Sequence, residues 1–153
     1  MRASTHRSRL MPANEPRRYS GGMTLTPFLM FTGQAEEAMN FYVSAFPDAE
    51  ILEMDRYGPE ETDREGTVKT ASFRIADQTL LCIDSPDVHA FGFTPSVSFF
   101  FDCPDEASLD ALFDRLSDQG QVLMPPGEYP FAQRYAWVSD RFGVSWQLSA
   151  TDK

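Results

Sequence analysis

Two stretches of the chain show the same order of hydrophobic and polar positions. In the first, a short apolar run at residues 27–31 precedes a helical pattern over about 34–46, where apolar residues recur every three or four positions. Three more apolar-rich runs follow at 50–57, 67–75 and 78–84, each of a length typical of strands. The pattern predicts a strand, a helix and three further strands.

The second stretch begins after a Pro-, Gly- and Asp-containing linker at 85–95. An apolar run at 97–101 predicts a strand, Asp102 is a suitable N-cap for the next helix, and Gly120 stands where a helix commonly ends. Three strands are expected after it, at residues 121–124, 134–139 and 144–149, with a loop at 125–133.

The two stretches match in spacing as well as in order. Apolar residues stand 8, 11 and 15 positions after both Phe31 and Phe101: Met39, Tyr42 and Phe46, then Leu109, Leu112 and Leu116. Two amphipathic helices can match by chance, but the shared order of all elements favours a duplication. Because each helix has one apolar face, it should cover one side of a sheet. We therefore predict an α+β fold of two β-α-β-β-β units, at about 24–85 and 96–149, whose curved sheets pair into a partly closed barrel with a concave face.

The last two predicted strands form a hairpin around the tight-turn tetrapeptide 140–143, Asp-Arg-Phe-Gly. Along its second strand, Val144, Trp146 and Leu148 alternate with small polar residues and the amide of Gln147. The polar side of this strand is either part of a ligand site or a solvated sheet surface.

The 153 residues fit a single domain, expected over 23–153. Residues 1–22 hold five arginines and one glutamate, and we expect a flexible, disordered leader or a misassigned start; a basic arm docked on the domain is the alternative. The rest has 8 basic and 22 acidic residues, a formal charge of −14, which argues against nucleic-acid binding. The sequence has no run of 18 apolar residues that would predict a membrane span. Cys82 and Cys103 show no C-x-x-C motif and favour a reduced, cytoplasmic protein, with a single disulfide as the alternative.

The chain resembles the vicinal oxygen chelate superfamily, which includes glyoxalases, extradiol dioxygenases and bleomycin-resistance proteins. The match is to the PhnB-like branch, often labelled a 3-demethylubiquinone-9 3-methyltransferase domain, and it covers about residues 24–149. Four segments carry it: Thr-Pro-Phe-Leu-Met-Phe at 26–31, Ala-Glu-Glu-Ala-Met-Asn-Phe-Tyr at 35–42 with Phe46-Pro47, Ser-Phe-Phe-Phe at 98–101, and Asp-Arg-Phe-Gly-Val-Ser-Trp-Gln at 140–147. The resemblance implies a glyoxalase/bleomycin resistance-like fold and a homodimer whose sites are completed across subunits.

Catalytic members of the superfamily place His and Glu metal ligands on the first and fourth strands of each unit. By spacing, these positions fall near Thr26 or Pro27, near Cys82 to Asp84, at Ser96 or Val97, and at Gln147. Only Asp84 among them is a plausible ligand for a divalent metal, since such ions prefer imidazole and carboxylate groups. His6 lies in the leader and His89 in the linker. We therefore expect no metal centre and no cofactor.

The methyltransferase label implies S-adenosylmethionine, but no Gly-x-Gly follows a predicted strand, as a Rossmann-like cofactor site requires. Candidate pocket residues are Gln147, Trp137, Tyr57, Asp84, Arg134 and Ser96. Simpler alternatives are packing for Trp137, a bond to a neighbouring strand for Gln147 and solvation for Arg134. Cys82, close to Asp84 in sequence, is expected to be an inert buried thiol. The sequence predicts a metal-independent small-molecule-binding protein. A superfamily lyase, isomerase or dioxygenase using Asp84, Gln147 and Arg134 is the alternative, and the labelled methyltransferase is a third.

Overall fold

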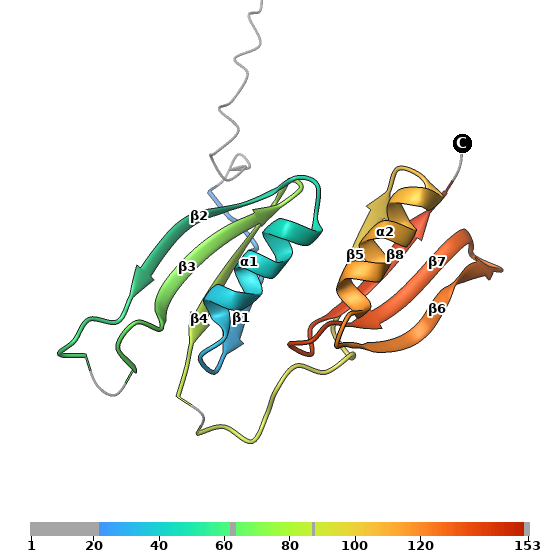
Figure 1. Ribbon diagram of the computed structural model, residues 1–153. Coiled ribbons are helices and arrows are strands. Elements are labelled where there is room, and N and C mark those ends of the chain that lie inside the picture. Colours follow the sequence, from blue (N-terminus) through green and yellow to red (C-terminus); the bar gives the residue numbers. More distant parts are fainter. Residues whose placement is uncertain (1–21, 62–63, 87, 152–153) are drawn as a thin grey trace, which may run out of the picture.

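The chain folds into two β-α-β-β-β units, seen side by side in a computed structural model that describes residues 22–61, 64–86 and 88–151 (Figure 1). The leader expected over residues 1–22 lies, except for Gly22, outside the described residues. The first unit comprises β1 (Phe28–Phe31), α1 (Ala35–Ala45), β2 (Ala49–Arg56), β3 (Val68–Ile75) and β4 (Gln78–Asp84). The second comprises β5 (Phe99–Cys103), α2 (Glu106–Ser117), β6 (Gln121–Tyr129), β7 (Ala132–Ser139) and β8 (Ser145–Ala150).

The two sheets have the same topology. Their strand orders are β1-β4-β3-β2 and β5-β8-β7-β6, with the first strand of each unit parallel to the fourth and all other pairs antiparallel. Helix α1 packs on the first sheet and α2 on the second, which leaves one face of each sheet without a helix (Figure 1). The predicted α+β fold of two repeated units is confirmed.

The helices begin and end differently from the sequence-based expectation. Asp105, and not Asp102, caps α2, with its Oδ1 accepting a hydrogen bond from the Ser108 N–H at 2.7 Å, while Asp102 belongs to β5. Gly120 follows the turn after α2, and a Cβ there would lie 2.3 Å from the Ser139 carbonyl oxygen. Glycine is needed at this position because two backbone segments come into close contact.

Strand β6 extends through Pro125, Pro126 and Gly127, where the sequence predicted a loop. Proline cannot donate to a sheet ladder, but β6 is an edge strand, and its pairing with β7 shifts register three times: after Val122, after Met124 and after Gly127. The irregular edge accommodates the prolines, so the expected loop is reduced to the short turn before Ala132.

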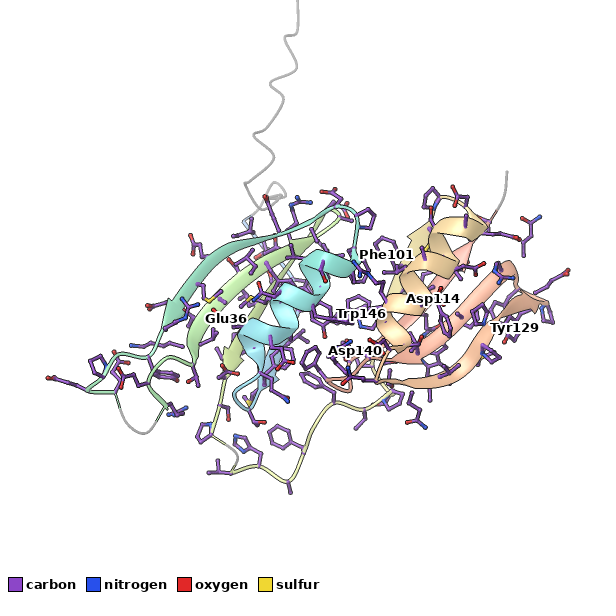
Figure 2. The ribbon with its side chains drawn as sticks, viewed as in Figure 1. Glu36, Phe101, Asp114, Tyr129, Asp140 and Trp146 are labelled. Carbon is purple, nitrogen blue, oxygen red and sulfur yellow. The ribbon has the colours of Figure 1, made fainter. Side chains whose placement is uncertain are left out.

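The two units meet through their helix-bearing sides. Asp140 accepts hydrogen bonds at Oδ2 from the Tyr42 hydroxyl on α1 (2.7 Å) and from Trp146 Nε1 on β8 (2.9 Å). The Phe46 ring lies 4.9 Å from the Trp146 ring and 5.1 Å from the Phe101 ring. Figure 2 shows Asp140, Trp146 and Phe101 between the two helices. The two sheets therefore remain separate within one chain. The units join at their helix-bearing sides, so this junction does not pair the two sheets into the barrel that the sequence predicted.

Candidate functional site

The helix-free side of the second sheet, here called the open face, includes Ser98, Phe100, Asp102, Tyr135, Trp137, Ser145, Gln147 and Ser149. Strand register places these side chains together: Gln147 pairs with Phe100 of β5 on one side and with Trp137 of β7 on the other. The intervening residues Trp146 and Leu148 are buried on the helix-bearing side. The alternation read from the sequence of this strand is confirmed.

Two aromatic side chains of β7 donate hydrogen bonds to polar side chains of β8. The Tyr135 hydroxyl donates to Gln147 Oε1 at 2.6 Å, and Trp137 Nε1 donates to Ser145 Oγ at 2.8 Å. Ser98 Oγ lies 3.1 Å from Ser145 Oγ and extends this network to the segment just before β5. Burial, and then the nearby Tyr129, raise the pKa of Tyr135, so its hydroxyl remains a proton donor at neutral pH. Gln147 and Trp137 are thus held in defined orientations.

Exposed aromatic rings border this face. Phe100 is 58% exposed and Phe131, at the tip of the β6–β7 hairpin, is 64% exposed. The Tyr135 ring lies 5.6 Å from the Tyr129 ring and 4.9 Å from the Phe131 ring, both in edge-on geometry. Figure 2 shows Tyr129 at the end of the hairpin farthest from the first unit. Apolar rings of this size in solvent mark a surface that can receive a ligand or a partner.

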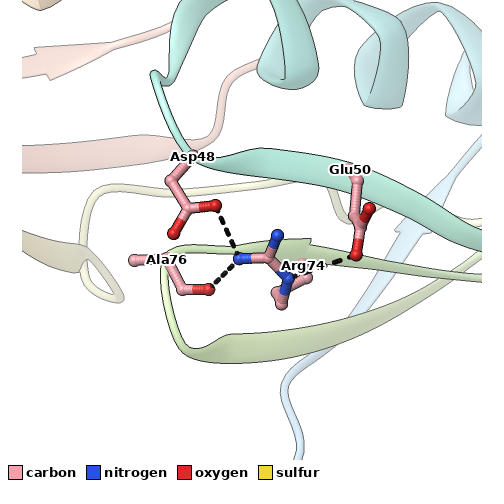
Figure 3. A network of polar contacts seen from close by, with 4 residues as sticks. All are labelled: Asp48, Glu50, Arg74 and Ala76. Atoms are coloured by element: carbon pink, nitrogen blue, oxygen red, sulfur yellow. Dashed lines mark hydrogen bonds and ion pairs between the residues drawn. The ribbon is translucent and has the colours of Figure 1, made fainter. Parts of the chain in front are cut away.

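The helix-free side of the first sheet has a different character. Residues of β2, β3 and β4 line a hollow of about 320 Å³: Glu53, Met54, Asp55, Thr70, Ala71, Ser72 and Leu81. Arg74 of the same sheet is held by Asp48 at 3.0 Å, by the Ala76 carbonyl, and by Glu50 at 3.5 Å (Figure 3). This network occupies the Arg74 guanidinium at the strand ends, where it ties β3 to β2.

The residues at the superfamily's metal-ligand positions do not fit a divalent metal centre. Phe31 pairs with Asp84 and Phe101 with Leu148, so the residue of β4 that corresponds to Gln147 is Ile83. Ser96 lies outside β5, with its hydroxyl 2.6 Å from that of Thr94, and the adjacent Val97 is 72% exposed. Among the residues that the structure describes, no three His, Cys, Asp or Glu side chains converge. An amide, serines and an isoleucine are poor ligands for Zn²⁺, Ni²⁺ or Fe²⁺.

Asp84 has a structural role: its carboxylate holds three backbone segments together. Its carboxylate accepts three backbone hydrogen bonds of 2.9 Å, from Gly33, Ala35 and Val68. The side chain is 2% exposed. Because Gln34 caps α1 without a side-chain hydrogen bond, Asp84 is the carboxylate that receives the first amide groups of this helix.

Arg134 and Tyr57 also lie away from Gln147. Arg134 Nε donates to Asp110 Oδ1 of α2 at 2.7 Å, an ion pair that raises the pKa of the arginine. The Arg134 side chain therefore belongs to the helix-bearing side. Tyr57 follows β2 and its ring lies 4.7 Å below the Arg64 guanidinium. Asp84, Gln147 and Arg134 consequently occupy three separate places in the chain and form no common site within it.

Cofactor binding of the S-adenosylmethionine type also lacks fitting residues. The turn between β1 and α1 contains one glycine, Gly33, and that between β5 and α2 contains Pro104 and Asp105. Neither turn is the glycine-rich strand-to-helix turn on which such cofactors bind. Both sheets are also mostly antiparallel, whereas the doubly wound sheet that binds such cofactors is mostly parallel.

Sequence reasoning did not identify the supporting roles of Tyr135, Ser145 and Ser98. The signal for Tyr135 and Ser145 was present in the alternation of the last hairpin, because residues two apart share a face. The signal for Ser98 required the register between β5 and β8, which the sequence does not encode locally.

Comparison with known proteins agrees with this geometry. The chain matches the family model described as 3-demethylubiquinone-9 3-methyltransferase over residues 23–149. The PhnB protein from Bacillus cereus is 45% identical, with a TM-score of 0.80 over 84% of this chain and 100% of that one. Protein PA1353 from Pseudomonas aeruginosa is 25% identical, with a TM-score of 0.74 over 86% and 99% of the two chains.

The fold alone extends further. The fosfomycin resistance protein FosX from Mesorhizobium loti is 15% identical, with a TM-score of 0.55 over 86% of this chain and 92% of that one. No curated protein matches the sequence. In the described part of the chain, no helix is long and apolar enough to cross a membrane. The paired units, the Asp140 hairpin and the family match together show that this chain belongs to the 3-demethylubiquinone-9 3-methyltransferase family, the PhnB-like branch of the vicinal oxygen chelate superfamily.

Proposed function

We propose that this protein binds a small molecule on the open face of the second sheet and does so without a metal ion. The observation that carries this proposal is the hydrogen-bonded set of uncharged side chains, in which Tyr135 holds Gln147 and Ser145 holds Trp137. Fixed polar groups among aromatic walls are the usual composition of a small-molecule site. The metal-free part of the proposal rests on the donor chemistry of Gln147, Ser96 and Ile83 at the ligand positions.

The proposed binding unit is a homodimer in which the open face of one copy meets the helix-free face of the first sheet of the other. On the two helix-free faces, Phe28 on β1 and Phe100 on β5 are 55% and 58% exposed. Burial of such side chains favours association, at about 25 cal/mol per Å² of apolar surface. The hollow over β2, β3 and β4 would then supply the second wall of the site.

Metal uptake tests the metal-free part of this proposal. The protein is incubated with Ni²⁺, Zn²⁺, Mn²⁺ or Fe²⁺, dialysed and subjected to elemental analysis. We expect less than one tenth of an equivalent of each metal to remain. One tightly bound equivalent that is lost on Gln147→Ala would overturn the proposal, and retention in the Gln147→Ala variant would indicate a metal elsewhere.

Sedimentation velocity tests the pairing of two copies. We expect a dimer for the unaltered protein and a monomer for Phe100→Asp, because the substitution places a charge in the proposed interface. Val88→Asp is a matched control, since Val88 is exposed but lies in the linker between the units. A monomeric unaltered protein would contradict the shared site.

The family description names methyl transfer, but the residues that the structure describes do not favour this reaction. Isothermal titration with S-adenosylmethionine checks this, and we expect no heat of binding. Saturable binding would bring the methyltransferase hypothesis forward in place of the proposed function.

A further inference from the structure

We infer that the open face of the second sheet takes a flat, uncharged ligand that carries a hydrogen-bond acceptor, such as an aromatic amide or ketone. This inference rests on the proposed function, because it specifies the ligand of the same face. It follows from a row of three side chains that runs across β5, β8 and β7: Phe100, Gln147 and Trp137.

The row has the dimensions of a small aromatic ring system. Phe100 and Trp137 lie in register on the two strands that flank Gln147. Neighbouring strands lie about 4.8 Å apart, so the backbones of the two aromatic residues are roughly 10 Å apart across the sheet. The hydrogen bond from Trp137 Nε1 to Ser145 Oγ holds the indole in place. A flat ligand of two fused rings lying over Gln147 can contact both aromatic residues, whereas a compact aliphatic ligand loses the stacking with their faces.

The fixed amide determines the polar group that the ligand must carry. The Tyr135 hydroxyl occupies Gln147 Oε1, so the Nε2 end of the planar amide points away from Tyr135. Nε2 has two N–H donors and no acceptor. A ligand that covers this amide must therefore supply an acceptor, because a covered donor without a partner is costly.

A flat ligand with an acceptor can be anionic, cationic or uncharged, and charge argues against the first two classes. The row and its supports Ser98, Tyr135 and Ser145 contain no ionised side chain. An anion would enter a domain whose formal charge over residues 23–153 is −14. A cation brings donors and no acceptor to the N–H groups of Gln147, and Asp102, a carboxylate on the same face, lies outside the row, beside Ser149. An uncharged acceptor is the class that meets neither obstacle.

Four probes separate these classes by isothermal titration calorimetry. They are 2-naphthamide (flat and uncharged), 2-naphthoate (flat and anionic), 2-naphthylmethylammonium (flat and cationic) and cyclohexanecarboxamide (uncharged and not flat). We expect 2-naphthamide to bind at least tenfold more tightly than each of the others. Equal or tighter binding of either charged probe would overturn the charge argument, and equal binding of cyclohexanecarboxamide would overturn the stacking argument.

The Gln147→Glu variant tests whether the N–H donors of the Gln147 amide bind the ligand. It keeps the shape of the side chain but replaces the N–H donors with a carboxylate, so the affinity for 2-naphthamide should fall at least tenfold and that for 2-naphthylmethylammonium should rise. Gln78→Glu is the matched control, because Gln78 is exposed on β4 of the other unit and its side chain donates to the Thr79 carbonyl; both affinities should stay unchanged. An unchanged affinity for 2-naphthamide in Gln147→Glu would overturn the assignment of the donor.

Failure of this inference can be told from failure of the proposed function. If no probe binds but another small molecule shifts the indole signal of Trp137 in an NMR spectrum, the ligand class is wrong and the proposed function stands. If no compound of any class affects Trp137 or Gln147, both are wrong.

Discussion

The Tyr42→Phe substitution should weaken the junction between the two units while leaving its packing intact. The Tyr42 side chain is fully buried, and its hydroxyl is one of four donors to the Asp140 carboxylate, beside Trp146 Nε1 and the backbone N–H groups of Phe142 and Val144. Trp146 and the two amides can only donate, so the arrangement requires the acceptor form of the carboxylate. Removal of one hydrogen bond to a charged group costs about 1.5–3 kcal/mol. We expect a loss of about 2 kcal/mol in the free energy of unfolding.

The measurement is urea unfolding followed by far-ultraviolet circular dichroism, at one fixed protein concentration because dimerisation would add to the apparent stability. Tyr129→Phe is the control, since the Tyr129 hydroxyl makes an exposed hydrogen bond to the Pro125 carbonyl, and the substitution should change stability by less than about 0.5 kcal/mol. The reasoning is refuted if Tyr42→Phe costs no more than Tyr129→Phe.

The pH dependence provides a second check on the same contact. Burial, and then the charge of Asp140, raise the pKa of Tyr42 well above 10.0. The unfolded chain releases this proton near pH 10 while the folded chain keeps it, so stability is fully present below pH 10 and is lost as the pH rises through the folded pKa. Tyr42→Phe should remove this part of the alkaline loss. An alkaline slope that is the same in both proteins would contradict the assignment.

Three further substitutions or measurements test other parts of the structure. Burial raises the pKa of Cys82 to about 12 and that of Cys103 to about 11. At pH 8 both thiols should therefore react with Ellman's reagent at least a hundredfold more slowly in the folded protein than in urea. Equal rates would contradict their burial. Asp84→Ala leaves three backbone N–H groups without their acceptor and should cost roughly 3 kcal/mol or more in urea unfolding, whereas the exposed Asp77→Ala should cost less than about 0.5 kcal/mol. Gly120→Ala forces a Cβ against the Ser139 carbonyl and should cost about 1–3 kcal/mol, while Gly92→Ala, with open space around it, should have little effect; similar losses in both would argue against the close backbone approach.

The sequence predicts the repeated units because their signals are local. Apolar spacing in the helices and alternation in the last hairpin depend on residues a few positions apart, and both are present in the structure. Strand β6 shows where this reasoning ends. Two prolines and a glycine predict a loop, but an edge position and three register shifts permit a strand, and edge position is a property of the whole sheet.

The candidate site could be predicted only in part for the same reason. Alternation places Gln147 and Trp137 on one face and, applied to β7, also places Arg134 on the other face with Ala136 and Val138. Asp84 was a candidate because spacing places it near the superfamily's ligand position on the fourth strand, where it is the residue with a carboxylate. Its use by Gly33, Ala35 and Val68 depends on contacts 16 to 51 residues away in the sequence.

The proposed metal-free site is tested most directly by the ¹⁵N–¹H NMR signals of the two tryptophan indoles during a screen of small uncharged aromatic compounds, with and without EDTA. Trp137 lies on the open face, whereas Trp146 is buried at the junction and bonded to Asp140, so it serves as an internal control. We expect binding compounds to shift the Trp137 indole and the Gln147 side-chain amide equally with and without EDTA, while the Trp146 signal stays in place. Shifts that EDTA abolishes, or shifts confined to Trp146, would contradict a metal-free site on this face.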